Sequence, residues 1–155
     1  MRTVRRAFTR PRALVSVFAA ALAAAFAVGP APAAQAGTQD LDNTWACSVP
    51  AGYTYDQVQS RLNTCGSGFT TQYHLRRGQD GILVCSLLPG FTYDLAQSRL
   101  NSCSTSGFST SYRMRTPANG LWACDVPPGF TYDLVQSRLN TCSISGFANS
   151  YRLRG

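Results

Sequence analysis

The chain of 155 residues contains no lysine and no glutamate, and His74 is its only histidine. Without a second histidine there is no imidazole pair for acid–base chemistry, and any Ser-His-Asp arrangement would depend on His74 alone. The corresponding position in two later, similar stretches is arginine, at Arg113 and Arg152. A catalytic base is not expected at a position that arginine fills twice. We therefore expect a protein that is not an enzyme.

Acidic side chains are also scarce, with seven aspartates in all. Asp56, Asp94 and Asp133 occur once in each similar stretch, whereas glycosidases use two carboxylates a few ångströms apart. A small hydrolase or an antibacterial toxin is therefore less favoured than a non-enzymatic function. We expect each of these aspartates to lie at the start of a helix, where the helix dipole favours negative charge.

A long hydrophobic run is missing everywhere except near the start, from Ala13 to Val28. It follows a basic segment and precedes Ala34-Gln35-Ala36, which fits the small-x-small cleavage pattern of a secretory signal peptide. The run is too short to span a membrane. We predict a signal peptide over residues 1–36, a secreted extracellular protein, and no membrane insertion after cleavage. Arg5-Arg6 leaves export by the twin-arginine route open.

The net charge of +7 largely disappears with this segment, because five of the fourteen arginines lie in residues 1–12. Nine arginines against seven aspartates leave the remaining chain at +2. So small a charge gives little long-range attraction to a polyanion, and nucleic acid is not expected as a partner.

The rest of the chain is a threefold repeat. Similar copies occupy residues 45–81, 82–120 and 121–155, with corresponding cysteines 38 and then 39 residues apart. Residues 37–44 precede them as an expected flexible leader. A single copy is too small to bury its apolar side chains alone, so we expect the copies to form one domain with a shared core.

Each copy predicts a strand, a helix and a second strand. The alternation in "TWACSV" favours a strand, and so does that in "FANSYRLR". In the segment between the two strands of the first copy, Thr54 resembles a helix N-cap, and a helical spacing relates Tyr55, Val58 and Leu62. The expected fold class is α+β, with strand–helix–strand repeats. Asp80-Gly81 and Asn119-Gly120 predict hairpins between copies, and pairing of the first and last strands would close a pseudo-threefold ring.

The cysteines predict disulfides rather than a metal site. There is no C-x-x-C pair, so zinc is not expected, and nothing indicates a cofactor. The repeat favours one bridge within each copy, each closing a loop of about 18 residues worth roughly 3 kcal/mol; exchange of bridges between copies is the alternative. The expected pairs are Cys47–Cys65, Cys85–Cys103 and Cys124–Cys142.

The candidate ligand-binding residues are arginines, because the aromatic side chains are assigned to the core. Phe69, Tyr73 and their counterparts are expected on the inner face of the second strand. The three recurring arginines have no same-face partner on the predicted helix. They bond a neighbouring repeat or offer equivalent donors to an anionic or polyhydroxyl ligand. They are Arg61, Arg99 and Arg138.

The run V-P-x-G-[YF]-T-Y-D, followed by a Gly-Phe, resembles the opening of PASTA domains, which bind cell-wall peptidoglycan. The resemblance covers about half of each copy, and the cysteines and the short period depart from that family. Our functional hypothesis is a secreted, multivalent binder of cell-wall peptidoglycan or environmental polysaccharide. The alternative is a secreted protease inhibitor that uses a rigid Pro-Gly loop beside a disulfide, such as "SVPAGY".

Overall fold

The computed structural model describes residues 40–155, so the predicted signal peptide lies outside the described residues. Within them there are nine strands and no helix. The strands are β1 (Trp45–Ala46), β2 (Tyr53–Leu62), β3 (Phe69–Arg77), β4 (Leu83–Val84), β5 (Thr92–Leu100), β6 (Phe108–Arg115), β7 (Trp122–Ala123), β8 (Thr131–Leu139) and β9 (Phe147–Arg154).

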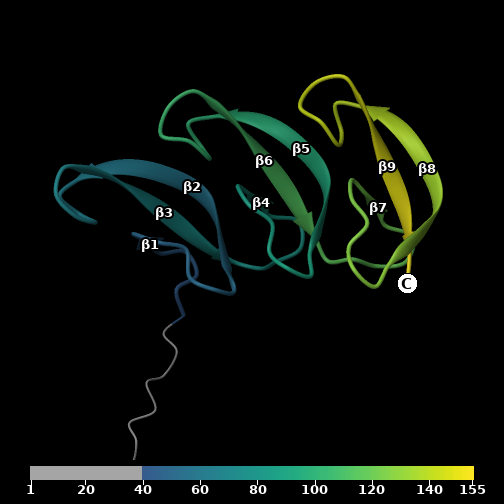
Figure 1. Ribbon diagram of the computed structural model, residues 1–155, viewed down its shortest axis with the longest axis horizontal. Helices are drawn as coiled ribbons and strands as arrows, with labels where there is room; N and C mark the ends of the chain where they lie inside the picture. Colours follow the sequence, from purple (N-terminus) through teal and green to yellow (C-terminus); the bar gives the residue numbers. More distant parts are fainter. Residues whose placement is uncertain (1–39) are drawn as a thin grey trace, which may run out of the picture. The chain divides into compact units, whose positions relative to one another are not determined.

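Each repeat forms its own antiparallel sheet of three strands (Figure 1). The orders are β1-β3-β2, β4-β6-β5 and β7-β9-β8, so the third strand of a repeat is always central. The two long strands form a hairpin, and the two-residue strand pairs with the other side of the central one. The three repeats predicted from the sequence are thereby confirmed.

The predicted helices are wrong, and with them the α+β class, because the protein is all-β. The segment beginning at Thr54 is the long strand β2, and its equivalents are β5 and β8. Thr54 is not an N-cap: its hydroxyl donates to the carbonyl oxygen of Ser86 in the next repeat, at 2.5 Å. Asp56 lies at a β-bulge rather than at a helix terminus.

The bulge explains why the strand resembles a helix in sequence. Tyr55 pairs with Leu75 and Val58 with Tyr73, and the register shifts between Tyr55 and Gln57. One inserted residue places Tyr55 and Val58, three apart in the chain, on the same face of the sheet. A spacing of three is also the spacing of a helical face, so the period of two is hidden at this point.

Neighbouring repeats meet along two equivalent seams. The first seam joins β2 to β4 and the second joins β5 to β7. In the first, the backbone N–H of Cys85 donates to the carbonyl of Tyr55 at 2.8 Å; in the second, Cys124 donates to Tyr93 at 2.7 Å. Burial raises the pKa of Tyr55, next to the first seam, and that of Tyr93, next to the second. Each repeat therefore makes backbone hydrogen bonds to the edge strand of the repeat before it.

The expected hairpins between repeats and the closed ring are also wrong. Gly81 and Gly120 do adopt the positive φ of a turn, both at 82°. The chain after Gly81, however, enters a different sheet, so β3 and β4 do not pair. Among the described residues β1 pairs with β3 alone, and β9 with β7 and β8, which leaves the first and last sheets unjoined. The arrangement is a linear array with nearest-neighbour contacts.

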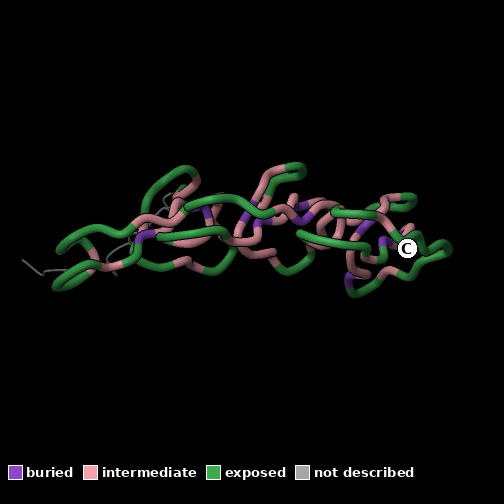
Figure 2. The backbone as a smooth tube through the Cα atoms, turned by 90° about the horizontal axis from the view of Figure 1, so that it is seen from above, coloured by how far each residue is buried: buried purple, intermediate pink, exposed green. Residues whose placement is uncertain are grey.

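The core is divided among the repeats rather than shared around an axis. One large apolar side chain of each central strand is fully buried at 0% exposure: Leu75, Met114 and Leu153. Figure 2 shows the buried residues as short, separate stretches between exposed segments. With so little buried apolar area in each unit, the covalent links contribute a large share of the stability.

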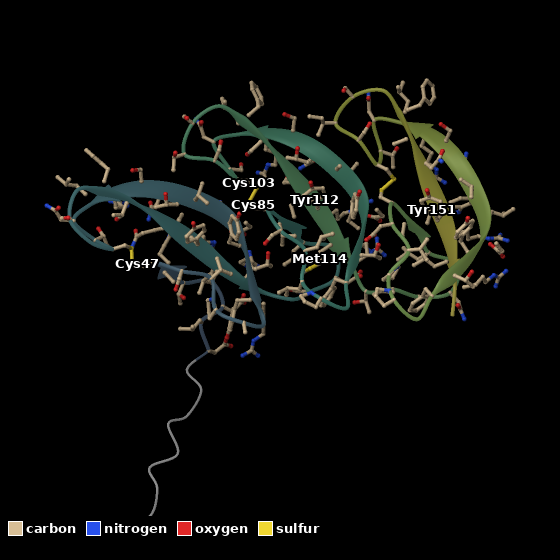
Figure 3. The ribbon with its side chains drawn as sticks, viewed as in Figure 1. Cys47, Cys85, Cys103, Tyr112, Met114 and Tyr151 are labelled. Carbon is tan, nitrogen blue, oxygen red and sulfur yellow. A yellow bond between two sulfur atoms is a disulfide. The ribbon has the colours of Figure 1, made fainter. Side chains whose placement is uncertain are left out.

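The disulfides have the predicted pairing, with one bridge inside each repeat. The cysteine after the short strand joins the cysteine after the long strand, with Cα–Cα distances of 5.1–5.4 Å. Cys85 and Cys103 lie side by side in the middle repeat (Figure 3). Several disulfides in a chain of this size are typical of extracellular proteins.

Candidate functional site: the three hairpin tips

At the loop end of each long hairpin, a leucine and a phenylalanine are exposed to solvent. Leu62 pairs across the hairpin with Phe69, and their exposed fractions are 56% and 76%. We call these pairs the hairpin tips. The other two, equally exposed, are Leu100–Phe108 and Leu139–Phe147.

This exposure corrects the assignment of these phenylalanines to the core. Phe69 does lie on the same face of β3 as Tyr73 and the buried Leu75, as the alternation predicted. The part of that face nearest the loop, however, is exposed to solvent. A single exposed apolar side chain is ordinary on a protein surface, but here an exposed Leu–Phe pair recurs at the same position of all three repeats.

The tips are held rigidly by their loops. The backbone N–H of Asn63 donates to the carbonyl of Gly68 at 2.8 Å, and the Asn63 side chain accepts from the Gly68 N–H at 2.9 Å. Asn63 has a φ of 54°, a left-handed conformation that asparagine tolerates better than most residues. Cys65, inside the same loop, is tied to Cys47. The loops of the other repeats are one residue longer and are closed by the equivalent backbone bond, from Asn101 to Gly107 and from Asn140 to Gly146, both at 2.9 Å.

An arginine precedes the leucine of every tip, and these are the arginines that the sequence singled out. Arg61 pairs with Thr70, so its side chain lies on the opposite face from Leu62 and Phe69. Within residues 40–155, Arg61 and Arg99 have no side-chain hydrogen bond or ion pair, and both are exposed. The first two tips thus have an apolar face and, opposite it, an exposed arginine.

Arg138 differs from the other two because it packs within its own repeat. Its guanidinium lies 4.9 Å from the ring centroid of Trp122 and donates to the side-chain oxygen of Gln136 at 3.0 Å. The corresponding position to Trp122 is Leu83 in the middle repeat, which offers no such ring. In the first repeat Trp45 packs against His74 instead, with the rings tilted by 50° and their centroids 5.0 Å apart.

The recurring aspartates form ion pairs. Asp56 accepts from Nδ1 of His74 at 2.7 Å and from Arg76 at 2.9 Å. In the last repeat Asp133 accepts from Arg152 at 2.7 Å and from Arg154 at 2.5 Å, and these bonds hold the pKa of Asp133 well below its usual range. Each bulge therefore carries a carboxylate held by two side chains of the central strand.

The middle repeat has the same arrangement, in which Asp94 is paired with Arg113 and Arg115. The hydrogen bond from Arg113 to Asp94 raises the pKa of that guanidinium, as the bond to Asp133 does for Arg152. His74 occupies the position of Arg113 and Arg152 and is hydrogen-bonded to the equivalent aspartate, Asp56.

The Pro-Gly loops considered for protease inhibition are tight turns. The N–H of Tyr53 donates to the carbonyl of Pro50 at 3.2 Å, and Phe91 does so to Leu88 at 3.1 Å. Such a bond folds the segment back on itself. Phe91 then packs against Gly78 of the preceding linker, where an added Cβ would lie 2.8 Å from its ring. An open pocket of about 470 Å³ lies beside this contact.

Residues 40–155 hold no group of three or more His, Cys, Asp or Glu side chains placed to bind a metal ion. The same part of the chain has no helix with the length and hydrophobicity needed to cross a membrane. No protein-family model, curated protein or solved structure matches the chain. The fold therefore defines the class of protein on its own: an all-β, disulfide-linked repeat protein.

Proposed function

We propose that this is a secreted, non-enzymatic protein that binds cell-wall peptidoglycan or environmental polysaccharide through its three hairpin tips. The observation that carries the proposal is the threefold repetition of an exposed phenylalanine on a disulfide-anchored loop. Aromatic rings present a flat apolar face, against which the C–H face of a sugar ring can stack. The disulfide framework supports an extracellular location.

Rigidity and repetition both favour weak but additive binding. A loop held by a disulfide and internal hydrogen bonds loses little conformational entropy when a ligand binds. Three equivalent tips on one chain raise the apparent affinity for a repetitive polymer by orders of magnitude over a single tip. Arg61 and Arg99 add cationic donors that suit the carboxylates of acidic glycans.

The arginines at the positions equivalent to His74 support the absence of catalysis. The His74 ring is bound to Asp56 at 2.7 Å, and the equivalent side chains Arg113 and Arg152 make the same contact without acid–base chemistry at neutral pH. Protease inhibition is less favoured because the Pro-Gly loops are closed turns rather than extended segments.

The test is retention of the oxidised protein on insoluble peptidoglycan, chitin and cellulose. We expect retention of the natural sequence on at least one polymer, weaker retention of the single variant F69S, and none of the triple variant F69S/F108S/F147S. The triple variant with leucine in place of serine is the matched control. It keeps apolar side chains without rings, and stacking on sugars predicts that it too is lost.

Retention of the leucine variant would indicate general apolar adhesion and would contradict recognition of sugars. A second comparison uses R61S and R77S, because Arg77 is also exposed but lies at the opposite end of the sheet, where it is paired with Asp40. Loss with R61S alone assigns the cationic face of the tip to the ligand. Failure of the natural protein to bind any polymer, with stoichiometric inhibition of a subtilisin- or trypsin-like protease, would replace the proposal by the alternative.

A further inference from the structure

The two seams between repeats use the same backbone groups. In the first, Cys85 donates to the carbonyl of Tyr55 and Val58 donates to the carbonyl of Ser102, both at 2.8 Å. The Tyr55 carbonyl and the Val58 N–H point away from their own sheet, because β2 is an edge strand of that sheet. The next repeat thus pairs with an otherwise open strand edge.

The second seam repeats this pattern at the corresponding positions. Cys124 donates to the carbonyl of Tyr93, and Ala96 donates to the carbonyl of Thr141, both at 2.7 Å. The Ala96 side chain is only 4% exposed, since the following repeat covers it. The first and second repeats therefore each accept the following repeat through the same backbone positions.

A threonine hydroxyl completes each seam. Thr54 donates to the carbonyl of Ser86, and Thr92 contacts the carboxylate of Asp125. Both threonines are fully buried at 0% exposure. The position that faces the threonine can therefore hold either serine or aspartate.

In the last repeat, no part of residues 40–155 covers the same edge. Tyr132, Leu134 and Val135 of β8 are 49%, 47% and 48% exposed, and almost the whole strand faces solvent. The equivalent strand of the middle repeat, β5, is largely covered. Within residues 40–155, neither the carbonyl of Tyr132 nor the N–H of Val135 has a backbone partner beyond its own sheet.

The first repeat carries the complementary surface, also open. Cys47 and Ser48 are exposed, whereas their counterparts in the later repeats are partly buried by the repeat before them. Thr64 is exposed, while its counterpart Ser102 is 8% exposed. In the described part of the chain the Cys47 N–H and the Thr64 carbonyl have no seam partner.

We propose that copies of this chain associate head to tail, with β8 of one copy docking on the first repeat of the next. The Cys47 N–H of the incoming copy donates to the Tyr132 carbonyl, and the Val135 N–H donates to the Thr64 carbonyl. The contact is the seam already present twice inside the chain, now formed between chains. Because the two surfaces differ, the association is heterologous and extends into open chains unless it closes into a ring.

Strand β8 also lacks the features that usually protect an exposed edge. It contains no proline, and its charged residues do not guard the edge, since Asp133 is paired with Arg152 and Arg154 and Arg138 packs on Trp122. An unprotected edge with apolar side chains is a template for another strand. The chain itself supplies the surface that fits.

The test measures molar mass against concentration for the oxidised protein in its natural processed form, by light scattering or sedimentation. We expect the mass to rise from one chain to multiples. V135D places a charge where Ala96 is covered in the second seam, and S48R places a bulky cation against the threonine position. Each variant should weaken association at least about tenfold, because a buried unpaired charge is strongly unfavourable.

The chain offers matched controls for both sites. V135A introduces the residue that fills this position in the second seam, and S48D introduces the residue that fills the other position there. Both should associate as the natural protein does. Circular dichroism and intact disulfides, measured on all four variants, check that the monomer is folded.

Mixing V135D with S48R gives the decisive result. V135D keeps an open first repeat, and S48R keeps an open β8, so the mixture should form a complex of one chain of each and nothing larger. A natural protein that stays a single chain at every concentration would overturn the proposal. Association of S48R by itself, with no complex in the mixture, would do so too, since it indicates β8 pairing with another β8.

Discussion

Asp94 accepts two hydrogen bonds from Arg113, at 2.6 and 3.0 Å, and a third from Arg115 at 2.9 Å. The carboxylate is 11% exposed, so it is held mainly by these two side chains. It sits at the bulge where β5 shifts register against β6. The ion pair therefore fixes the point at which the strand changes the direction of its side chains.

D94N should destabilise the protein by about 1–2 kcal/mol, because neutral asparagine cannot satisfy two guanidinium groups. Urea unfolding of the oxidised variant measures this. D80N is the control: Asp80 also contacts Arg115, but it is far more exposed, and its loss should cost less. Equal costs for the two variants would contradict a special role for the bulge carboxylate.

The stability contributed by Asp133 should depend on pH in a defined direction. Its pKa in the folded protein is lowered by Arg152 and Arg154, so the folded state favours the ionised form. The contribution is fully present above the unfolded pKa of about 3.9 and is lost as the pH falls toward the folded pKa. We expect the difference in unfolding free energy between the natural chain and D133N to shrink below about pH 4. A difference that grows in acid would refute this account.

His74 should be replaceable by the residue found at its position in the other repeats. H74R restores the Asp–Arg pair of those repeats, and arginine stays charged at all practical pH values. We expect the urea midpoint at pH 7 to be unchanged or higher, and lower for H74A, which leaves Asp56 with only Arg76. If H74R were as damaging as H74A, the histidine would have a role that arginine cannot fill.

The repeats, the disulfide pairs and the face of each central strand were predictable, because cysteine spacing and period-two alternation act locally. The long strands were not. At Tyr55 and Val58 the bulge converts a strand spacing into a helical one, and nothing near Asp56 in sequence distinguishes a bulge from a helix start. What distinguishes the bulge from a helix start is the tertiary pairing of Asp56, whose partners lie on the opposite strand, 18–20 residues away.

The hairpin tips were missed for a different reason. Alternation assigned Phe69 to the correct face but cannot say how far along the strand that face is covered. Cover depends on the short strand and on the neighbouring repeat, whose position follows from the seams. The threefold recurrence of Leu62 and Phe69 at a loop boundary was the available signal, since a residue beside a Gly-rich loop lies at the end of its strand.

The seams should contribute measurably to stability wherever both repeats are present. Thr54 is fully buried and its hydroxyl donates to the Ser86 carbonyl, whereas Thr131, its counterpart on the open edge of β8, is exposed. T54V should cost about 1 kcal/mol, because the carbonyl loses its partner at a site that water does not reach. T131V should change stability little, because its hydroxyl exchanges only with water. The two substitutions are chemically identical, so intrinsic strand propensity cancels in the comparison.

Urea unfolding of both variants, at a concentration where the protein is a single chain, measures the two changes in unfolding free energy. Equal changes at the two positions would show that the seam hydroxyl does not stabilise the array of repeats.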